Sequence, residues 1–465
     1  MTVLKLKAAP ILAGIVLTIY ICSPVMAQQG ATVTLQAIID SAAHHLPVIL
    51  EKQALLNSAT AAITDASHSR LPQLKVLEEV SGASANSVAG AYFPMSTVPS
   101  VSGSIRDQNM FKPEIGNIGM LYSQYDLLDF GLKKAEVQNA QAFASLSKSD
   151  LEREQYIVKW QAGKAYFDLM EAEYQMSVEQ QNLSRYQNIA TIIRAVTKSG
   201  LRPGSDSSEI NAALSQTVIK FNLSQAKVTE LQQQLSYLTG VTPGQLIVDT
   251  TLQSQPLPVP VNQALDTAQN PFLTFYGAQI NFFKTNHQLI DKTYQPKVEL
   301  ISGIWGRASS IEYNDQYKSL VNGLGFQRYN YAAAVSFVYN LFDGVHRRDK
   351  LAVSQYQVEA SQAAFQQQQQ DLLNELQQED NNITTEDKNL REMPVQLQAA
   401  KDAYEQKLAQ YNAGVINLLD LINATYILYQ AQTGYVELLN GWYSSNLNKA
   451  AITGGLDQFI QTIKK

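Results

Sequence analysis

The amino-acid sequence predicts a mainly α-helical protein with a small β part, built from two tandem copies of one unit. The first observation is a repeated turn, in which Gly200 precedes Asp206 as Gly414 precedes Asp420. The second is that one common offset also relates other identical pairs along the chain: Tyr125 and Tyr339, Asp129 and Asp343, Leu183 and Leu397, Thr239 and Thr453. The third is that long stretches without proline alternate with short segments of period two. Each repeat should hold one long helix, two shorter stacked helices and two strands.

The duplication sets the expected domain boundaries. We expect a signal peptide at 1–27, a first repeat at 28–249, a Pro-rich linker at 250–262, a second repeat at 263–456 and a short C-terminal tail at 457–465. The leader has Lys5 and Lys7, then an apolar stretch, then a small-residue cleavage site ending at Ala27. The single cysteine, Cys22, lies inside it, and Ile21 before it argues against lipidation, which requires a small residue there.

Composition excludes several classes of function. Acidic residues outnumber basic ones, 41 to 35, for a net charge of −6, which argues against nucleic acid as a partner. The one histidine pair, His44 and His45, would diverge by about 100° on a helix, so a shared metal is not expected. No phosphate loop follows a strand and no Ser/His/Asp set is evident. We therefore expect no cofactor, no metal and no catalytic residue, and hence not an enzyme.

Helices account for most of the chain. The segment from Leu35 to about Arg70 has an apolar face, and Leu132 to Lys198 reads as uninterrupted helix, because no proline lies between Pro113 and Pro203. That long helix would extend about 100 Å at 1.5 Å per residue. A further helix is predicted from about Ser205 to Thr239. The two shorter helices laid end to end match the long one, which predicts a cylinder rather than a compact domain.

The C-terminal helix carries two adjoining apolar stripes. One alternates spacings of four and three, as in a coiled coil: Leu418, Ile422, Thr425, Tyr429, Gln432, Val436, Leu439 and Tyr443. The other recurs at sevens: Leu421, Leu428, Tyr435 and Trp442. Two stripes indicate a helix with neighbours on two sides, as in a closed ring of helices.

Four strands are expected, two before each long helix. The clearest alternates from Tyr331 to Leu341, and its partner alternates from Val298 to Ile304. The first repeat has weaker equivalents at about 73–83 and 116–127. After the leader no apolar run is long enough for a transmembrane helix. Four strands cannot close a barrel alone, whereas three copies would supply twelve. The sequence therefore predicts a trimer that forms a 12-stranded β-barrel.

The order and duplication of several segments resemble one protein family. The segments are "YNAGVINLLDLINATYILYQAQTGYVELLNGWYSSNLNKAAITGGL", "SGLRPGSDSSEINAALSQTVIKFNLSQAKVTELQQQLSYLTG", "LPQLKV", "YDLLDFG" and "YNLFDG". Together they resemble TolC-type outer-membrane efflux proteins, also called outer-membrane factors, over residues 33–456. The resemblance implies an outer-membrane trimer with its β-barrel in lipid and an α-helical barrel in the periplasm. It further implies a passive exit duct of a tripartite efflux or type I secretion system, with a periplasmic adaptor (membrane fusion protein) and an inner-membrane transporter as partners.

The resemblance implies that the functional site lies at the two helical hairpin tips. Gly200, Leu201 and Arg202 in one turn, and Gly414, Val415 and Ile416 in the other, match the adaptor-docking tips. By resemblance, Asp420 matches the ring that constricts the entrance, and Tyr411, Ser205 and Asp206 match the contacts that close it. The alternative reading is purely structural, because glycine suits a helix C-terminus and aspartate suits the first turn of the next helix.

This sequence departs from the family pattern at two gate positions. Asn423 stands where a second ring aspartate is expected, and Ile416 stands where a gate arginine is expected. The closing contacts therefore differ, and Arg202 is a candidate substitute charge. Pro394 interrupts the second long helix, where a kink is expected.

Two other classes of protein compete with the duct. A periplasmic adaptor also carries long helical hairpins, but it would show one hairpin flanked by compact β-domains. A structural coiled-coil trimer without a channel would not need the alternating strand from Tyr331 to Leu341. The duplicated order of strand pair and hairpin favours the duct over both.

Overall fold

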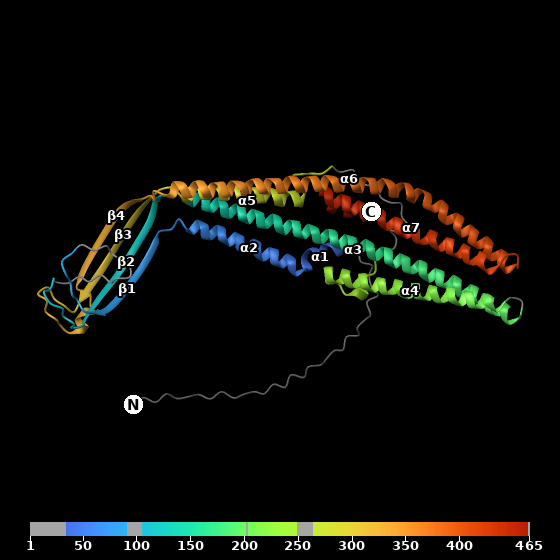
Figure 1. The fold of residues 1–465 in the computed structure, drawn as a ribbon, viewed down its shortest axis with the longest axis horizontal. Helices are drawn as coiled ribbons and strands as arrows, with labels where there is room; N and C mark the ends of the chain where they lie inside the picture. The colour runs from blue at the N-terminus through green and yellow to red at the C-terminus, as the bar shows by residue number, and fades with distance from the viewer. Residues whose placement is uncertain (1–33, 91–104, 201–202, 249–263, 464–465) are drawn as a thin grey trace, which may run out of the picture.

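The computed structural model describes residues 34–90, 105–200, 203–248 and 264–463. The predicted leader and linker, and the tip residues Leu201 and Arg202, lie outside these ranges. The fold is mostly helical, with one small sheet at one end and long helices running to the other (Figure 1). None of the described helices is long and apolar enough to cross a membrane.

Both repeats share the order of one or two short helices, a strand pair, a long helix and a shorter helix. The first contains α1 (Leu35–His45), α2 (Pro47–His68), β1 (Gln73–Ala83), β2 (Glu114–Leu128), α3 (Leu132–Lys198), α4 (Gly204–Thr239) and η1 (Pro243–Gln245). The second contains α5 (Pro271–Thr293), β3 (Lys297–Ser309), η3 (Leu320–Gly323), β4 (Arg328–Val338), α6 (Asp343–Asn412), α7 (Leu418–Thr453) and α8 (Leu456–Ile463). The predicted mix of long helices, short helices and strand pairs is confirmed.

The long helices have the predicted extents, but the first short helix does not. Helix α3 is continuous over its 67 residues, and α2 and α4 lie along it one after the other (Figure 1). The single helix predicted from Leu35 is wrong, because it breaks at Leu46, which is extended with φ −69° and ψ 137°. The ring of Pro47 disfavours helical backbone at the residue before it, and Pro47 then starts α2.

Helix α6 passes through Pro394 without a break. It curves along its length toward the tip, where it approaches α7 (Figure 1). Proline removes one backbone hydrogen bond from the helix, which α6 tolerates within its 70 residues.

The sheet is antiparallel with strand order β1-β2-β3-β4, and its two faces differ. One row of paired residues crosses all four strands on the same face: Val76, Leu121, Ile304 and Tyr331. The other face carries charged and amide side chains such as Lys75, Gln124 and Glu299. Strand β4 ends at Val338, earlier than predicted, because Val338 pairs with Lys297, where β3 begins after Pro296.

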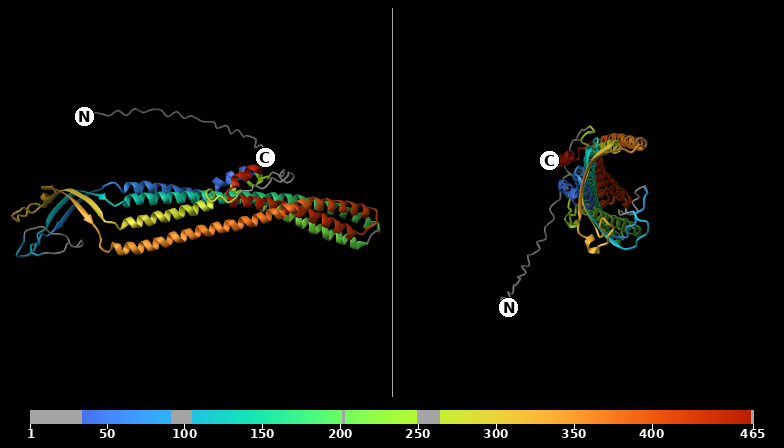
Figure 2. Two further views of the ribbon diagram at one scale, coloured as in Figure 1. Left: turned by 90° about the horizontal axis from the view of Figure 1, so that it is seen from above. Right: turned by 90° about the vertical axis from the view of Figure 1, so that its left-hand side faces the viewer.

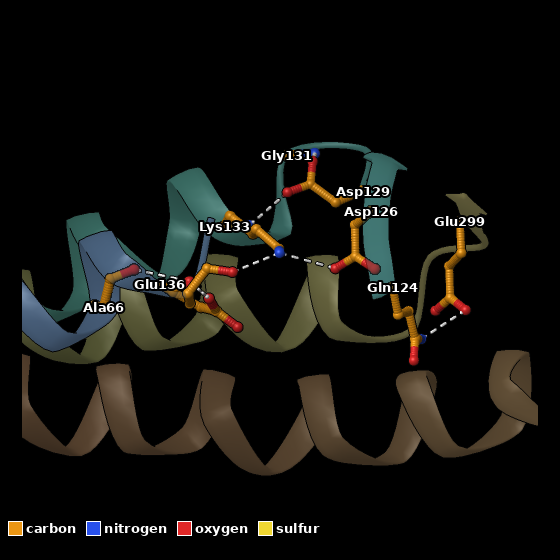
Figure 3. A network of polar contacts seen from close by, with 9 residues as sticks. Ala66, Gln124, Asp126, Asp129, Gly131, Lys133, Glu136 and Glu299 are labelled. Carbon is orange, nitrogen blue, oxygen red and sulfur yellow. Dashed lines mark hydrogen bonds and ion pairs between the residues drawn. The ribbon is translucent and has the colours of Figure 1, made fainter. Parts of the chain in front are cut away.

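The junction between β2 and α3 is fixed by polar contacts (Figure 3). Asp129 accepts hydrogen bonds from the backbone N–H groups of Gly131 and Lys133, at 2.9 and 3.0 Å. The Lys133 ammonium contacts Asp126 at 3.0 Å and the backbone carbonyl of Ser69. These contacts set the direction in which α3 leaves the sheet.

The main hydrophobic core lies midway along the helices, where α1, α3, α4, α7 and α8 meet. Figure 2 shows α1 and α8 gathered at this level on one side of the bundle. Phe167 stacks on Tyr443 with ring centroids 5.0 Å apart, and Phe459 of α8 packs against the pair. Helix α8 thus lies where only a short tail was expected. The stripes predicted on α7 face this core and its continuation toward the tip, and Leu421, Leu428 and Trp442 are buried.

Candidate functional site at the helix tips

The two repeated turns lie together at the end of the molecule farthest from the sheet (Figures 1 and 2). Residues from both hairpins form one hydrophobic cluster, which we call the tip core: Tyr186, Ile189, Ala190, Ile193, Ile210, Tyr411, Leu418 and Leu421. Helices α3, α4, α6 and α7 all contribute to it. The tip core therefore joins the two repeats into a single end, rather than leaving two separate hairpins.

Both turns depend on a glycine with left-handed backbone. Gly200 and Gly414 each have φ +74°, and neither would place an added Cβ within 4 Å of another atom. At Gly414 the amide donates to Tyr411 O, and the next amide, Val415 N–H, donates to Gln410 O, both at 2.9 Å. This pair of bonds is a Schellman motif. The glycines serve backbone conformation rather than close packing.

The two aspartates occupy equivalent places after the turns. Asp206 and Asp420 both lie in the first turn of their helices, where the positive end of the helix dipole favours a carboxylate. Their surroundings differ. Asn417 caps α7 by accepting a hydrogen bond from the Asp420 N–H at 2.9 Å, whereas α4 begins after Pro203 without a side-chain cap. The Ser205 hydroxyl donates to Asp206 at 3.4 Å.

The remaining predicted site residues fall into two groups. Val415 is 73% exposed, and Asp420 and Asn423 are also exposed. Tyr411, by contrast, is only 6% exposed and belongs to the tip core, against which Ile416 packs. In this conformation Tyr411 supports the hairpin from inside.

The sequence analysis missed a partly buried polar layer that separates the tip core from the main core. The layer consists of Gln175 and Glu179 on α3, Lys220 on α4, and Tyr429 and Thr433 on α7. Glu179 is 4% exposed, and its Oε1 accepts hydrogen bonds from Tyr429 Oη at 2.7 Å and from Gln175 Nε2 at 2.9 Å. Glu179 Oε2 is buried without a partner among the described residues.

A cation–π contact and a hydrogen bond join Lys220 to Tyr429 within this layer. The Lys220 ammonium lies 4.5 Å from the Tyr429 ring centroid and 3.4 Å from its hydroxyl. Burial, and next the hydrogen bond to Glu179, raise the pKa of Tyr429 to about 12. Tyr429 is therefore neutral at physiological pH and donates its hydroxyl proton to Glu179 Oε1.

A second polar contact lies on the tip side of this layer. The Arg185 guanidinium donates to Gln432 Oε1 at 2.7 Å and lies over the Tyr404 ring at 5.9 Å, so that it links α3, α7 and α6. Burial lowers the pKa of Arg185. Its Nε is buried without a partner within the described ranges.

The sequence did contain a signal for the polar layer. Ala172, Glu179, Tyr186 and Ile193 recur at intervals of seven on α3, and all four are buried. An acid in such a buried heptad series requires a partner from a neighbouring helix. In the described part of the chain no group of three or more His, Cys, Asp or Glu side chains could hold a metal ion.

Solved structures of outer-membrane channels have this fold. The CmeC outer membrane channel of Campylobacter jejuni is 14% identical with a TM-score of 0.72, covering 91% of this chain and 86% of that one. The outer membrane protein VceC of Vibrio cholerae is 16% identical with a TM-score of 0.71, covering 91% and 96%. The open-state MtrE outer membrane channel of Neisseria gonorrhoeae is 17% identical with a TM-score of 0.69, covering 91% and 89%.

These likenesses define the class as an outer-membrane channel fold. Residues 308–455 match the family model described as outer membrane efflux protein. This match covers most of the second repeat and agrees with the resemblance to outer-membrane efflux proteins found in the sequence. Comparison with curated protein sequences gave no match.

Proposed function

We propose that three copies of this chain form the exit duct of a tripartite efflux pump or type I secretion system. Each copy contributes four strands to a 12-stranded barrel in the outer membrane and its long helices to a tunnel through the periplasm. A periplasmic adaptor docks at the tips, and an inner-membrane transporter supplies the energy. The duct itself conducts passively and performs no chemistry.

The main support for this proposal is the sheet, which has open edges and one apolar and one polar face. β1 and β4 each pair on one side only within the described sheet, and such open edges are not tolerated in lipid. Closing three sheets edge to edge would satisfy them. Strands of 11 residues are about 36 Å long, and a tilt of roughly 40° reduces their height to about 28 Å. This height matches the apolar band of about 25 Å of outer-membrane barrels. The apolar face would then meet lipid and the polar face would line the channel.

The tips supply the proposed gate and docking surface. Exposed Val415 and the turn glycines Gly200 and Gly414 lie where an adaptor could reach them. Asp420 is exposed in the first turn of α7, so three copies would place a ring of carboxylates around the entrance. Asp206 and Ser205 would stand beside that ring, with Asn423 one helical turn farther along α7.

Single-channel conductance in a planar lipid bilayer tests this function. We expect small, cation-selective openings from a detergent-purified trimer, its subunit number measured on the same preparation. Asp420→Asn should weaken the cation preference, because the ring loses its charge. Asp457→Asn is the matched control, since Asp457 is on α8, away from the tips, and pairs with Lys159. Protein that forms no channels and stays soluble without detergent would instead favour the adaptor class.

A further inference from the structure

A polar groove lies between α3 and α5, next to the sheet. Its volume is about 530 Å³, and its polar lining consists of Lys134, Gln138, His287, Gln288, Asp291 and Lys292. None of these residues belongs to the tips or to the polar layer. Six of its eight lining residues have polar or charged side chains, which can hydrogen-bond to a charged ligand.

The balance of charge in the groove is positive, although the chain as a whole is acidic. Its only carboxylate, Asp291, is already paired: Arg347 of α6 donates two hydrogen bonds to it, one from Nε at 3.0 Å, and the Lys292 ammonium lies 3.5 Å away. Burial raises the pKa of Asp291, but the hydrogen bonds and charges of Arg347 and Lys292 outweigh this and lower it. The groove lining thus holds two lysines and one carboxylate, and Arg347 and Lys292 already pair with that carboxylate.

Several groups in the groove can contact a ligand, including the Lys292 ammonium, which lies 3.5 Å from Asp291 and is partly exposed. Lys134 is an exposed lining residue of the groove, and no described residue forms an ion pair or hydrogen bond with its ammonium. His287 Nδ1 lies 3.2 Å from Ser354 Oγ, and when the Ser354 hydroxyl donates to Nδ1, the Nε2–H of His287 is left as a donor for a ligand. Gln138 and Gln288 add exposed amide groups. Ammonium, imidazole and amide donors around one hollow are the groups that bind phosphate oxygens.

The position of the groove suggests where such a phosphate would come from. Gly131, at one end of the groove, follows closely after β2, and Lys292, on its other wall, shortly precedes β3. If the sheet spans the outer membrane, a step that rests on the proposed function, the groove lies at the level of the periplasmic headgroups. Lysines at this depth interact favourably with anionic lipid.

We propose that the groove between α3 and α5 binds a phosphate group, supplied by a phospholipid headgroup of the periplasmic leaflet. Lys134 and Lys292 supply the charge, and His287 and the two glutamines supply further hydrogen bonds. The bound headgroup would fix the height of the protein in the membrane at the point where sheet and helices meet. Free phosphate shares this chemistry and is the alternative source of the ligand.

Native mass spectrometry of the delipidated, detergent-purified protein tests the site. Phosphatidylglycerol is titrated in, and bound lipid is counted per chain. Replacing both lysines, K134Q with K292Q, should lower affinity by about 100-fold, since each lost charge-assisted hydrogen bond is worth roughly tenfold or more. Lys284→Gln is the matched control, because Lys284 is an exposed lysine on α5 that does not line the groove. It should leave affinity unchanged.

A variant that is expected to bind the lipid more tightly provides a second test. Asp291→Asn removes the groove's only carboxylate and releases Lys292 and Arg347, so phosphatidylglycerol should bind up to about fivefold tighter. Inorganic phosphate titrated alone identifies the source. Displacement of the lipid by phosphate, with the same dependence on the two lysines, would support the site with free phosphate as its ligand.

Equal lipid binding by the double-lysine variant and the Lys284 control would overturn the proposal. Conductance measured on the same preparation separates this result from failure of the proposed function. A conducting trimer without lysine-dependent binding refutes only the groove. A protein that binds lipid through both lysines yet forms no channel refutes only the duct.

Discussion

The substitution Gly414→Ala tests how much the left-handed backbone at residue 414 contributes to the stability of the turn between α6 and α7. The added Cβ would meet no atom within 4 Å, so alanine introduces no clash. The only cost is the left-handed backbone at φ +74°, about 1–2 kcal/mol for a residue with a Cβ. That cost weakens the two Schellman hydrogen bonds, from Gly414 N–H to Tyr411 O and from Val415 N–H to Gln410 O. The destabilisation should therefore be confined to the turn between α6 and α7.

Amide hydrogen exchange of the purified protein measures this local effect. A cost of 1–2 kcal/mol raises the open population of the turn by about 5- to 30-fold, so the amides of Gly414 and Val415 should exchange faster by that factor. Gly414→Asn should lie closer to wild type, because asparagine tolerates left-handed backbone. Gly204→Ala is the matched control. It also points into open space but has no positive φ, so alanine should stabilise the start of α4 by about 0.5–1 kcal/mol.

The reasoning would be refuted by either of two results. Equal exchange at the turn in the Gly414→Ala variant and in wild type would mean that the backbone relaxes without cost. Faster exchange in the main core would mean that the turn is coupled to the whole fold rather than opening locally.

Three further predictions concern the helical bundle. Tyr429→Phe removes the 2.7 Å hydrogen bond to Glu179 and should destabilise the protein by about 1.5–3 kcal/mol in denaturant unfolding, whereas the exposed neighbour Tyr426→Phe should have little effect. Burial raises the pKa values of Tyr429 and Tyr443 from 10.0 to about 12, so their neutral forms stabilise the fold fully below pH 10 and this stability is lost as pH rises through 12. An alkaline titration of tyrosinate absorbance and circular dichroism should show the two changes together in that window. Ile210→Ala, at a site with no exposed area in the tip core, should cost about 2–5 kcal/mol, seen as faster exchange at the tip.

Much of the fold could be predicted because it depends on local chemistry. The extent of α3 follows from the absence of proline between Pro113 and Pro203, and the strand faces follow from period two. The buried stripes of α7 follow from its coiled-coil spacing. Each of these features is decided within one element, so a single sequence is enough to reveal it.

Features that depend on which helices are neighbours could not be predicted in the same way. The heptad spacing on α3 indicates that Glu179 is buried, but it does not show that its partner is Tyr429 of the other repeat. The groove lysines Lys134 and Lys292 come from different repeats, and no sequence spacing relates them. The break at Leu46 is different, because Pro47 already signalled it locally and the longer apolar periodicity was given too much weight.

The two turns share the positions of their glycine and aspartate but differ in how the helix that follows begins. Both glycines have the same φ, and both aspartates lie in the first turn of a helix. Only the second turn has a side-chain cap, from Asn417, and a cap of this kind is worth about 1 kcal/mol. The start of α4 lacks that contribution and has Gly204 as its first helical residue, a poor helix former. On local energetics the start of α4 is therefore less stable than the start of α7, although both helices pack into the same tip core.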